Sequence, residues 1–178
     1  MVEMEEYRIK QCKRKQEDAQ QYATAQINLA LERLETVRAS LPTQKQLQRA
    51  EKKYSDAVKY HQALQDWRME IAETNLAHWR KKRQMHSYQT SYNKEIKEKF
   101  KKPKEQLLRM QKVGILFEPE KEDKIRLSTL KKLEPIHEFK RQLDADYKNK
   151  MEQFREEEQE ILEQKIPFQQ YRTAREEE

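Results

Sequence analysis

The residues best suited to chemistry in this chain are cationic side chains gathered between positions 80 and 112. This stretch holds 12 Lys/Arg and three acidic residues, a net charge of +9. A four-residue basic cluster and three interleaved aromatic residues belong to it: Arg80, Lys81, Lys82, Arg83, Tyr88, Tyr92 and Phe100. Such side chains can neutralise phosphates or acidic protein surfaces, and the rings can stack on bases. Three interpretations stay open: a solvated helix face, a contact with an acidic protein, or a contact with nucleic acid.

Large apolar side chains outside this stretch are the second set of candidate partner-binding residues. Trp67 and Trp79 lie on a predicted long helix, and a thin helix cannot bury tryptophan by itself. Exposed aromatic residues often dominate binding at protein interfaces, so both are candidate hot spots. Burial against another helix of the same chain is the equal alternative. Ile115 and Phe117 lie in an apolar stretch and are expected to dock into a pocket of this chain or of a partner.

Signals for catalysis, cofactors or metals are missing from the sequence. We find no phosphate-binding loop, no GxSxG, no HExxH and no glycine-rich turn. The four histidines show no i, i+4 pairing, and Cys12 has no second cysteine to join it in a metal site. We therefore expect no enzymatic activity, no cofactor and no bound metal.

The composition predicts which elements must position these side chains. Charged residues make up 39% of the 178 residues, the hydrophobic set 35%, and there is one glycine with five prolines. Residues with high helix propensity dominate, while tight turns need glycine. We expect an all-α, elongated chain with coiled-coil character, not a compact globule. Disorder is the competing interpretation, but helical spacing of apolar residues and 15 aromatic residues (eight Tyr, five Phe and two Trp) weigh against it.

Five segments follow from the helical periodicity and its interruptions. We expect a first helix at 3–41, a long basic central helix at 43–113, an extended linker at 114–119, a third helical region at 120–166 kinked at Pro135, and a polar tail at 167–178. The breaks fall near Pro42, Pro103–Gly114 and Pro135. Thr43 and Gln46 form a capping-box pattern after Pro42. Whether Pro42 and Gly114 mark hairpins or kinks is open.

The distribution of charge and the search for targeting signals help to predict the partner and the cellular compartment. Residues 1–117 have a net charge of +10 and residues 118–178 a net charge of −4. The basic part favours an acidic partner surface. No apolar run approaches the roughly 20 residues of a membrane span, and the first residues do not form a secretory signal. With a single cysteine, these features predict a soluble protein of the cytoplasm or cytoskeleton, with no membrane partner.

In overall character the chain resembles the helical proteins of ciliary doublet microtubules, namely the microtubule inner proteins and axonemal coiled-coil proteins. Lysine- and glutamine-rich helices, the isolated aromatics Trp67, Trp79, Tyr88 and Tyr92, and the connector 115–119 carry this resemblance. It implies a structural scaffold in the axoneme of a cilium or flagellum, with tubulin or coiled-coil proteins as partners. The alternative is a helical subunit of a nuclear or ribonucleoprotein complex that contacts nucleic acid through residues 80–112.

Overall fold

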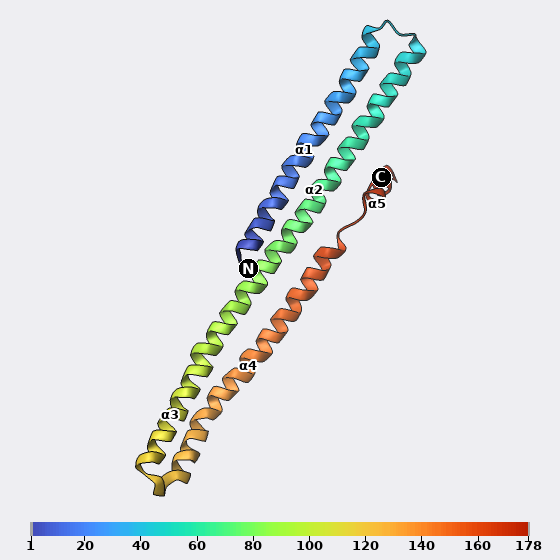
Figure 1. Ribbon diagram of the computed structural model, residues 1–178. Helices are drawn as coiled ribbons and strands as arrows, with labels where there is room; N and C mark the ends of the chain where they lie inside the picture. The colour runs from blue at the N-terminus through green and yellow to red at the C-terminus, as the bar shows by residue number, and fades with distance from the viewer. Residues whose placement is uncertain (1, 178) are drawn as a thin grey trace. The chain divides into compact units, whose positions relative to one another are not determined.

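The computed structural model describes residues 2–177, and nearly all of them are helical (Figure 1). The elements in chain order are α1 (Val2–Ala39), α2 (Gln44–Glu95), the π-helix η1 (Ile96–Lys101), α3 (Lys102–Phe117), the 3-10 helix η2 (Pro119–Lys121), α4 (Glu122–Glu163) and α5 (Phe168–Glu177). Residues 2–177 contain no strand, and the all-α class is confirmed. The chain divides into two units: unit 1 holds the residues up to Lys82 and from Glu158 onward, and unit 2 holds Arg83–Glu157.

In unit 1, α1 runs antiparallel to the first part of α2 (Figure 1). Near the connection Arg38 pairs with Glu51 at 3.1 Å, and further along the guanidinium of Arg68 lies 4.9 Å from the ring centroid of Tyr22. Small residues let the two backbones approach closely. Ala19, Ala23 and Ala72 are all buried. The chain therefore reverses at Pro42, and the first of the two open questions is answered as a hairpin.

The reversal is made without glycine. Helix α1 ends with the amide of Ser40 donating to the carbonyl of Val37 at 3.1 Å, and Leu41 then adopts a left-handed φ of 52°. Pro42 prevents the helix from continuing. The next helix begins with the amide of Thr43 donating to the side-chain oxygen of Gln46 at 2.9 Å, which is one half of the predicted capping box.

The C-terminal residues of unit 1 pack on α2 and do not form the polar tail predicted at 167–178. Helix α5 begins after Pro167, and its Tyr171 is 6% exposed, with the hydroxyl 3.1 Å from an oxygen of Glu70. Phe168 and Tyr171 lie three residues apart and so share one face of the helix. Most residues of this segment are polar, so its short apolar face was not predicted from the sequence. Glu178 lies outside the described residues.

Unit 2 is a second antiparallel hairpin, formed by the end of α2, η1 and α3 on one side and α4 on the other (Figure 1). The ring of Phe100 lies 5.4 Å from that of His137, and a Cβ added to Gly114 would lie 3.5 Å from side-chain carbons of Ile125. In an antiparallel pair of helices, the numbers of two residues in contact have a nearly constant sum. Here the sums are 237 for Phe100 and His137 and 239 for Gly114 and Ile125. The chain therefore reverses a second time, between α3 and α4.

The extended linker predicted at 114–119 is instead helical as far as Phe117. Gly114 does not have a positive φ and does not stop the helix. The stop comes at Glu118, with φ −134° and ψ 65°, because Pro119 disfavours the α conformation in the residue before it. The amide of Glu118 still donates to the carbonyl of Gly114 at 2.9 Å.

The other two prolines are accommodated within helical backbone. Pro103 opens α3 directly after η1, and the amide of Lys102 bonds the carbonyl of Lys97, five residues earlier. The wider π turn makes room for the proline ring, which would clash with the carbonyl four residues before it. Pro135, where the sequence predicted a kink, lies inside α4, and helical backbone continues through it. Lys131, four residues earlier, is exposed, so water can bond the carbonyl that Pro135 leaves unpaired.

Replacing Leu41 with glycine should stabilise unit 1. Leu41 is 94% exposed and gains little from packing, while its left-handed backbone costs roughly 1–2 kcal/mol. We expect Leu41→Gly to raise the free energy of unfolding by roughly 0.5–1 kcal/mol, after the greater freedom of glycine in the unfolded chain is counted. Urea titration followed by tryptophan fluorescence measures this, because Trp67 and Trp79 both belong to unit 1. Leu41→Ala keeps the Cβ and is the control; an equal gain from alanine would contradict the prediction.

Replacing Gly114 with alanine should stabilise unit 2. The added Cβ would make ordinary van der Waals contact with Ile125, and alanine is favoured over glycine inside a helix by about 1 kcal/mol. We expect Gly114→Ala to raise the free energy of unfolding by about that amount, as measured by circular dichroism during thermal unfolding. A clear loss of stability would show instead that position 114 needs the freedom of glycine, as an extended linker would.

Candidate partner-binding surface

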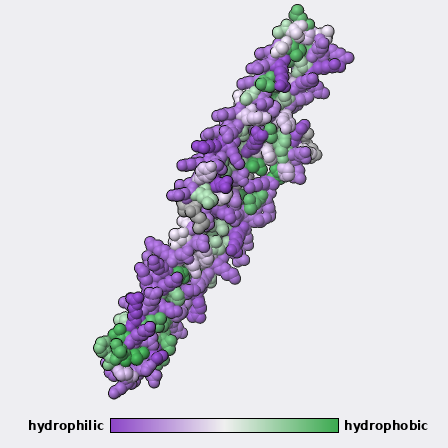
Figure 2. Space-filling view, in the orientation of Figure 1, coloured by the Kyte–Doolittle hydropathy of each residue, from purple (hydrophilic) through white to green (hydrophobic). Residues whose placement is uncertain are grey.

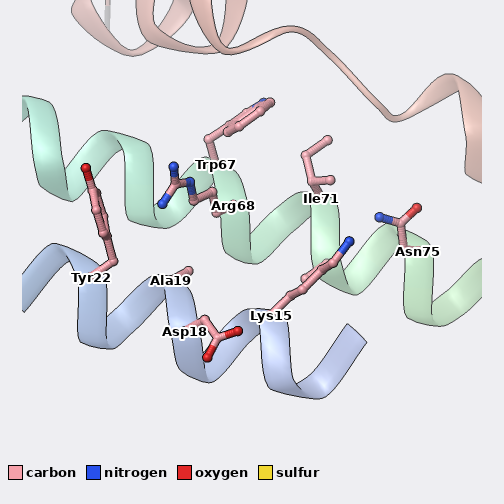
Figure 3. A pocket seen from close by; sticks show the side chains of 9 residues that line it. Lys15, Asp18, Ala19, Tyr22, Trp67, Arg68, Ile71 and Asn75 are labelled. Carbon is pink, nitrogen blue, oxygen red and sulfur yellow. The ribbon is translucent and has the colours of Figure 1, made fainter. Parts of the chain in front are cut away.

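Trp67 is held inside unit 1. Its indole nitrogen donates to the carbonyl of Ile166 at 2.8 Å, and its ring lies 5.5 Å from that of Phe168. On its other side the indole lines a groove of ≈ 410 Å³ between α1 and α2, together with Tyr22 and Ile71 (Figure 3). Trp67 is nevertheless half-buried, so part of its ring stays open to solvent.

Trp79 also has a neighbour within unit 1. The guanidinium of Arg8 on α1 lies 5.8 Å from its ring centroid, within the range of a cation–π interaction. The indole is half-buried, so part of the ring stays open to solvent. Trp79 therefore ties the start of α1 to α2 and leaves only a partial surface for a partner.

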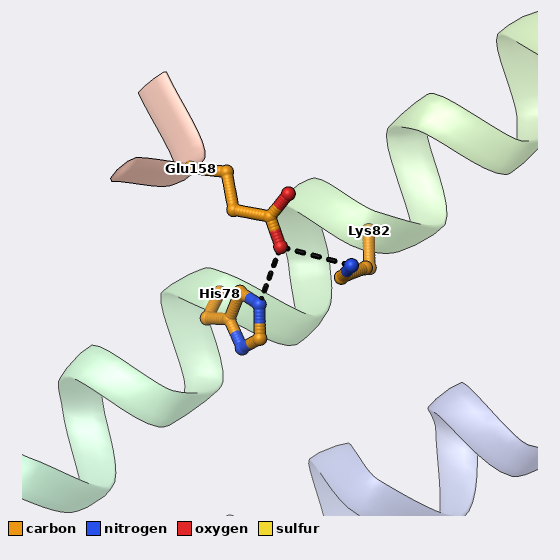
Figure 4. Close-up of polar contacts among 3 residues, drawn as sticks. All are labelled: His78, Lys82 and Glu158. Carbon is orange, nitrogen blue, oxygen red and sulfur yellow. Dashed lines mark hydrogen bonds and ion pairs between the residues drawn. The ribbon is translucent and has the colours of Figure 1, made fainter. Parts of the chain in front are cut away.

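The predicted basic cluster at positions 80–83 takes part in polar contacts of the chain itself. In unit 1, Glu158 accepts from the Nζ of Lys82 at 2.9 Å and lies 2.7 Å from Nε2 of His78 (Figure 4). Burial pushes the pKa of Glu158 upward, but the hydrogen bonds from Lys82 and His78 outweigh it, so the pKa is lowered. The carboxylate therefore fastens the last turns of α4 to α2.

The other members of the cluster differ in exposure. Arg80 and Arg83 are exposed and Lys81 is half-buried. Lys81 and Arg83 each interact with another residue. The cluster is therefore a surface feature that already contributes to the internal structure, and only part of its charge is available to a partner.

Tyr88 and Tyr92 point toward α4 in unit 2. The ring of Tyr92 stacks on that of Tyr147 with centroids 4.0 Å apart, and Tyr88 lies parallel to the same ring at 5.9 Å. Tyr88 also meets Phe154 edge-on at 6.0 Å. These rings form the aromatic packing of the unit, and they leave little face for stacking on a base.

A polar pair accompanies this aromatic packing. The hydroxyl of Tyr92 donates to Asp144 at 2.6 Å, and Lys140 bonds the other oxygen of the same carboxylate. The bond to Asp144, with some burial, raises the pKa of Tyr92 to about 12. The bonds from Lys140 and then Tyr92 lower the pKa of Asp144. The pair helps to fix the register of α2 against α4.

Of the two residues predicted to dock from a linker, one is largely exposed. Phe117 is 78% exposed at the end of α3, while Ile115 is half-buried. Other exposed apolar side chains lie along α3 and the first half of α4, and together with Phe117 we call them the tip cluster: Leu108, Met110, Val113, Leu116, Phe117, Leu127 and Leu130. Figure 2 shows apolar atoms gathered at this end of unit 2. Of these residues, the sequence analysis singled out Phe117 alone.

A groove of ≈ 290 Å³ lies between α3 and α4 beside the tip cluster. Its apolar lining comes from Leu107, Met110 and Ile125, and three lysines of one rim belong to η2 and α4: Lys121, Lys124 and Lys132. None of the described residues that line it is acidic. This part of unit 2 thus presents exposed apolar side chains beside cations.

Chemistry of other kinds finds little support among residues 2–177. No group of three His, Cys, Asp or Glu side chains is placed to hold a metal ion in this part of the chain. Cys12 is buried, and burial raises the pKa of its thiol. None of the helices in the described range combines the length and apolar character that a bilayer span requires.

Comparisons with known proteins give this chain no relative. No family model, no curated protein and no solved structure matches it.

Removing the hydroxyl of Tyr92 should destabilise unit 2. A hydrogen bond to a carboxylate contributes about 1.5–3 kcal/mol, and partial exposure places this one near about 1 kcal/mol. We expect Tyr92→Phe to lower the free energy of unfolding by about 1 kcal/mol, as measured by urea titration followed by circular dichroism. Tyr88→Phe is the matched control, because the hydroxyl of Tyr88 has no hydrogen-bond partner among the described residues, and it should be nearly neutral.

The same pair predicts a pH dependence. Since the folded-state pKa of Tyr92 is raised from 10.0 to about 12, its contribution to stability is full below pH 10 and is lost as the pH rises from 10 toward 12. Phenolate absorbance should show one tyrosine that titrates late, and Asp144→Asn should lower its midpoint. A titration of Tyr92 near pH 10 in the folded protein would contradict the pairing.

Proposed function

We propose that this protein is a non-enzymatic helical scaffold that binds along a filament or large assembly of the microtubule or axoneme type. The observation that supports this proposal best is the tip cluster of unit 2. Exposed apolar side chains gathered in one part of a protein, with polar residues around them, mark candidate protein interaction sites. Phe117 and Met110, at 78% and 62% exposed, are the largest anchors that such a contact could use.

The charge of unit 2 favours an acidic partner. Residues 83–157 hold 19 Lys/Arg and 14 acidic residues, a net charge of +5, whereas the whole chain has +6. Positive charge near an apolar contact speeds encounter with an acidic surface, and the apolar side chains then hold the complex. The surface of tubulin is acidic, so a microtubule fits this requirement.

Nucleic acid fits the same unit less well. Tyr88, Tyr92 and Phe100 were the rings that could stack on bases, and all three pack against residues of α4. The lysines of residues 80–112 could still neutralise phosphates. This alternative is a competing outcome of the test below.

The test compares binding to microtubules and to RNA for the same variants. We expect Met110→Ser/Phe117→Ser to weaken co-sedimentation with microtubules at least about tenfold, because two apolar anchors are lost. Leu41→Ser is the matched control: it removes an apolar side chain that is 94% exposed in unit 1 and should leave binding unchanged.

Localisation in ciliated cells is the second readout, because a protein of the microtubule lumen can escape co-sedimentation. The wild-type chain should lie along the axoneme, and the double variant should be displaced from it. RNA affinity that falls steeply with salt, together with no association with microtubules or axonemes, would contradict the proposal.

A further inference from the structure

We infer that the groove between α3 and α4 receives an acidic amphipathic helix of the partner, which completes a three-helix bundle. This inference rests on the proposed function in taking the tip of unit 2 as the docking site. It adds the kind of element that docks there. Three features of unit 2 support it: an unfilled helix position, an apolar stripe of helical spacing, and cations on one rim.

Unit 1 shows how a helix of this chain is packed when its neighbours are complete. There α2 contacts α1 through Tyr22 and Arg68, and it contacts the C-terminal segment through Trp67 and Ile166. Two neighbours cover two sides of one helix. In unit 2 the described residues that line the groove belong to α3, the short η2 and α4, so no third long helix lies in it. A third helix position is therefore unfilled.

The apolar residues beside the groove have the spacing of a helix-packing seam. Met110, Val113 and Phe117 follow one another at i, i+3 and i+7, so they form a single stripe along α3. Met110 also lines the groove, and Val113 and Phe117 continue the stripe toward the end of the helix. Their exposed fractions are 62%, 53% and 78%. A helix laid along the groove would cover this stripe for about two turns.

The opposite rim selects the charge of that helix. Lys121, Lys124 and Lys132 line the groove, and Lys121 pairs with Glu118 at 2.8 Å. Lys124 and Lys132 are exposed and have no ion-pair partner in the described part of the chain. A basic helix would be repelled by these cations, whereas glutamates flanking an apolar stripe would pair with them. The complementary occupant is therefore an acidic amphipathic helix.

The experiment uses the full chain and two synthetic helical peptides of about three heptads each. One peptide has leucine at the seam positions and glutamate on both flanks, and its twin has lysine in place of every glutamate. We expect the acidic peptide to bind at least about tenfold more tightly at low salt, as measured by fluorescence anisotropy, and this difference to narrow as salt screens the charges.

Charge reversal assigns the preference to the groove. Lys124→Glu/Lys132→Glu should abolish or invert the preference for the acidic peptide. Lys94→Glu/Lys97→Glu makes the same change in net charge on exposed residues of unit 2 that lie on α2 and η1 and do not line the groove, and it should preserve the preference. Circular dichroism should show equal helicity for all variants. An equal effect of both double variants would overturn the inference, because it would show attraction by net charge alone.

Two further outcomes would also overturn it. The first is binding of neither peptide, or of both equally. The second is a stable dimer that Lys124→Glu/Lys132→Glu dissociates, which would show that a second copy of this chain fills the groove. If microtubule binding persists while the peptide preference is absent, the groove inference fails alone. If the preference holds while microtubules and axonemes are not bound, the proposed function fails and the acidic-helix site stands.

Discussion

Antiparallel pairing of neighbouring helices supplies the burial in each unit, because only 35% of the residues are hydrophobic. Helices this polar can bury apolar surface only along a narrow seam shared with a neighbour. In unit 1 that seam is built from small residues such as Ala19 and Ala72, which let backbones approach. In unit 2 it is built from rings such as Tyr92 and Tyr147, which supply contact area where aliphatic side chains are few. Both seams use apolar residues, which are few in this chain. Apolar side chains that nevertheless stay exposed are therefore candidates for a binding surface.

The helical class and the stop at Pro42 could be predicted from sequence, since propensity, proline and capping act locally. The direction of the chain after each stop could not. A proline ends a helix, but the choice between reversal and continuation depends on which seams pair afterwards. Leu41 adopts a left-handed conformation that its side chain does not favour, because the pairing of α1 with α2 compensates for the strain. The prediction that the helix stops at Gly114 was wrong. Pro119 sets the end of α3, and Gly114 lies inside the helix.

In the candidate site, too, the sequence indicates which side chains matter but not which residues, far along the chain, they contact. The sequence predicted Trp67 and Tyr92 as partner-binding residues, whereas the contacts that the structure gives them lie within the chain. It could not show that their partners are Ile166 and Asp144, far along the chain. The stripe that ends at Phe117 had a recognisable helical spacing in the sequence. The predicted linker at 114–119 hid this stripe, because it divided one helix face between two segments.

The position of lysines beside the exposed stripe of α3 has a consequence for specificity. An apolar patch without charge would pair with any similar patch, above all with the same patch on a second copy of the chain. Lys124 and Lys132 oppose that pairing, because two copies would bring like charges together across a partly dry contact. In the complex that we propose, the same cations would pair with the carboxylates of an acidic helix. One set of side chains thus both disfavours self-association and favours an acidic partner, so the lysines contribute to specificity beyond keeping the tip soluble.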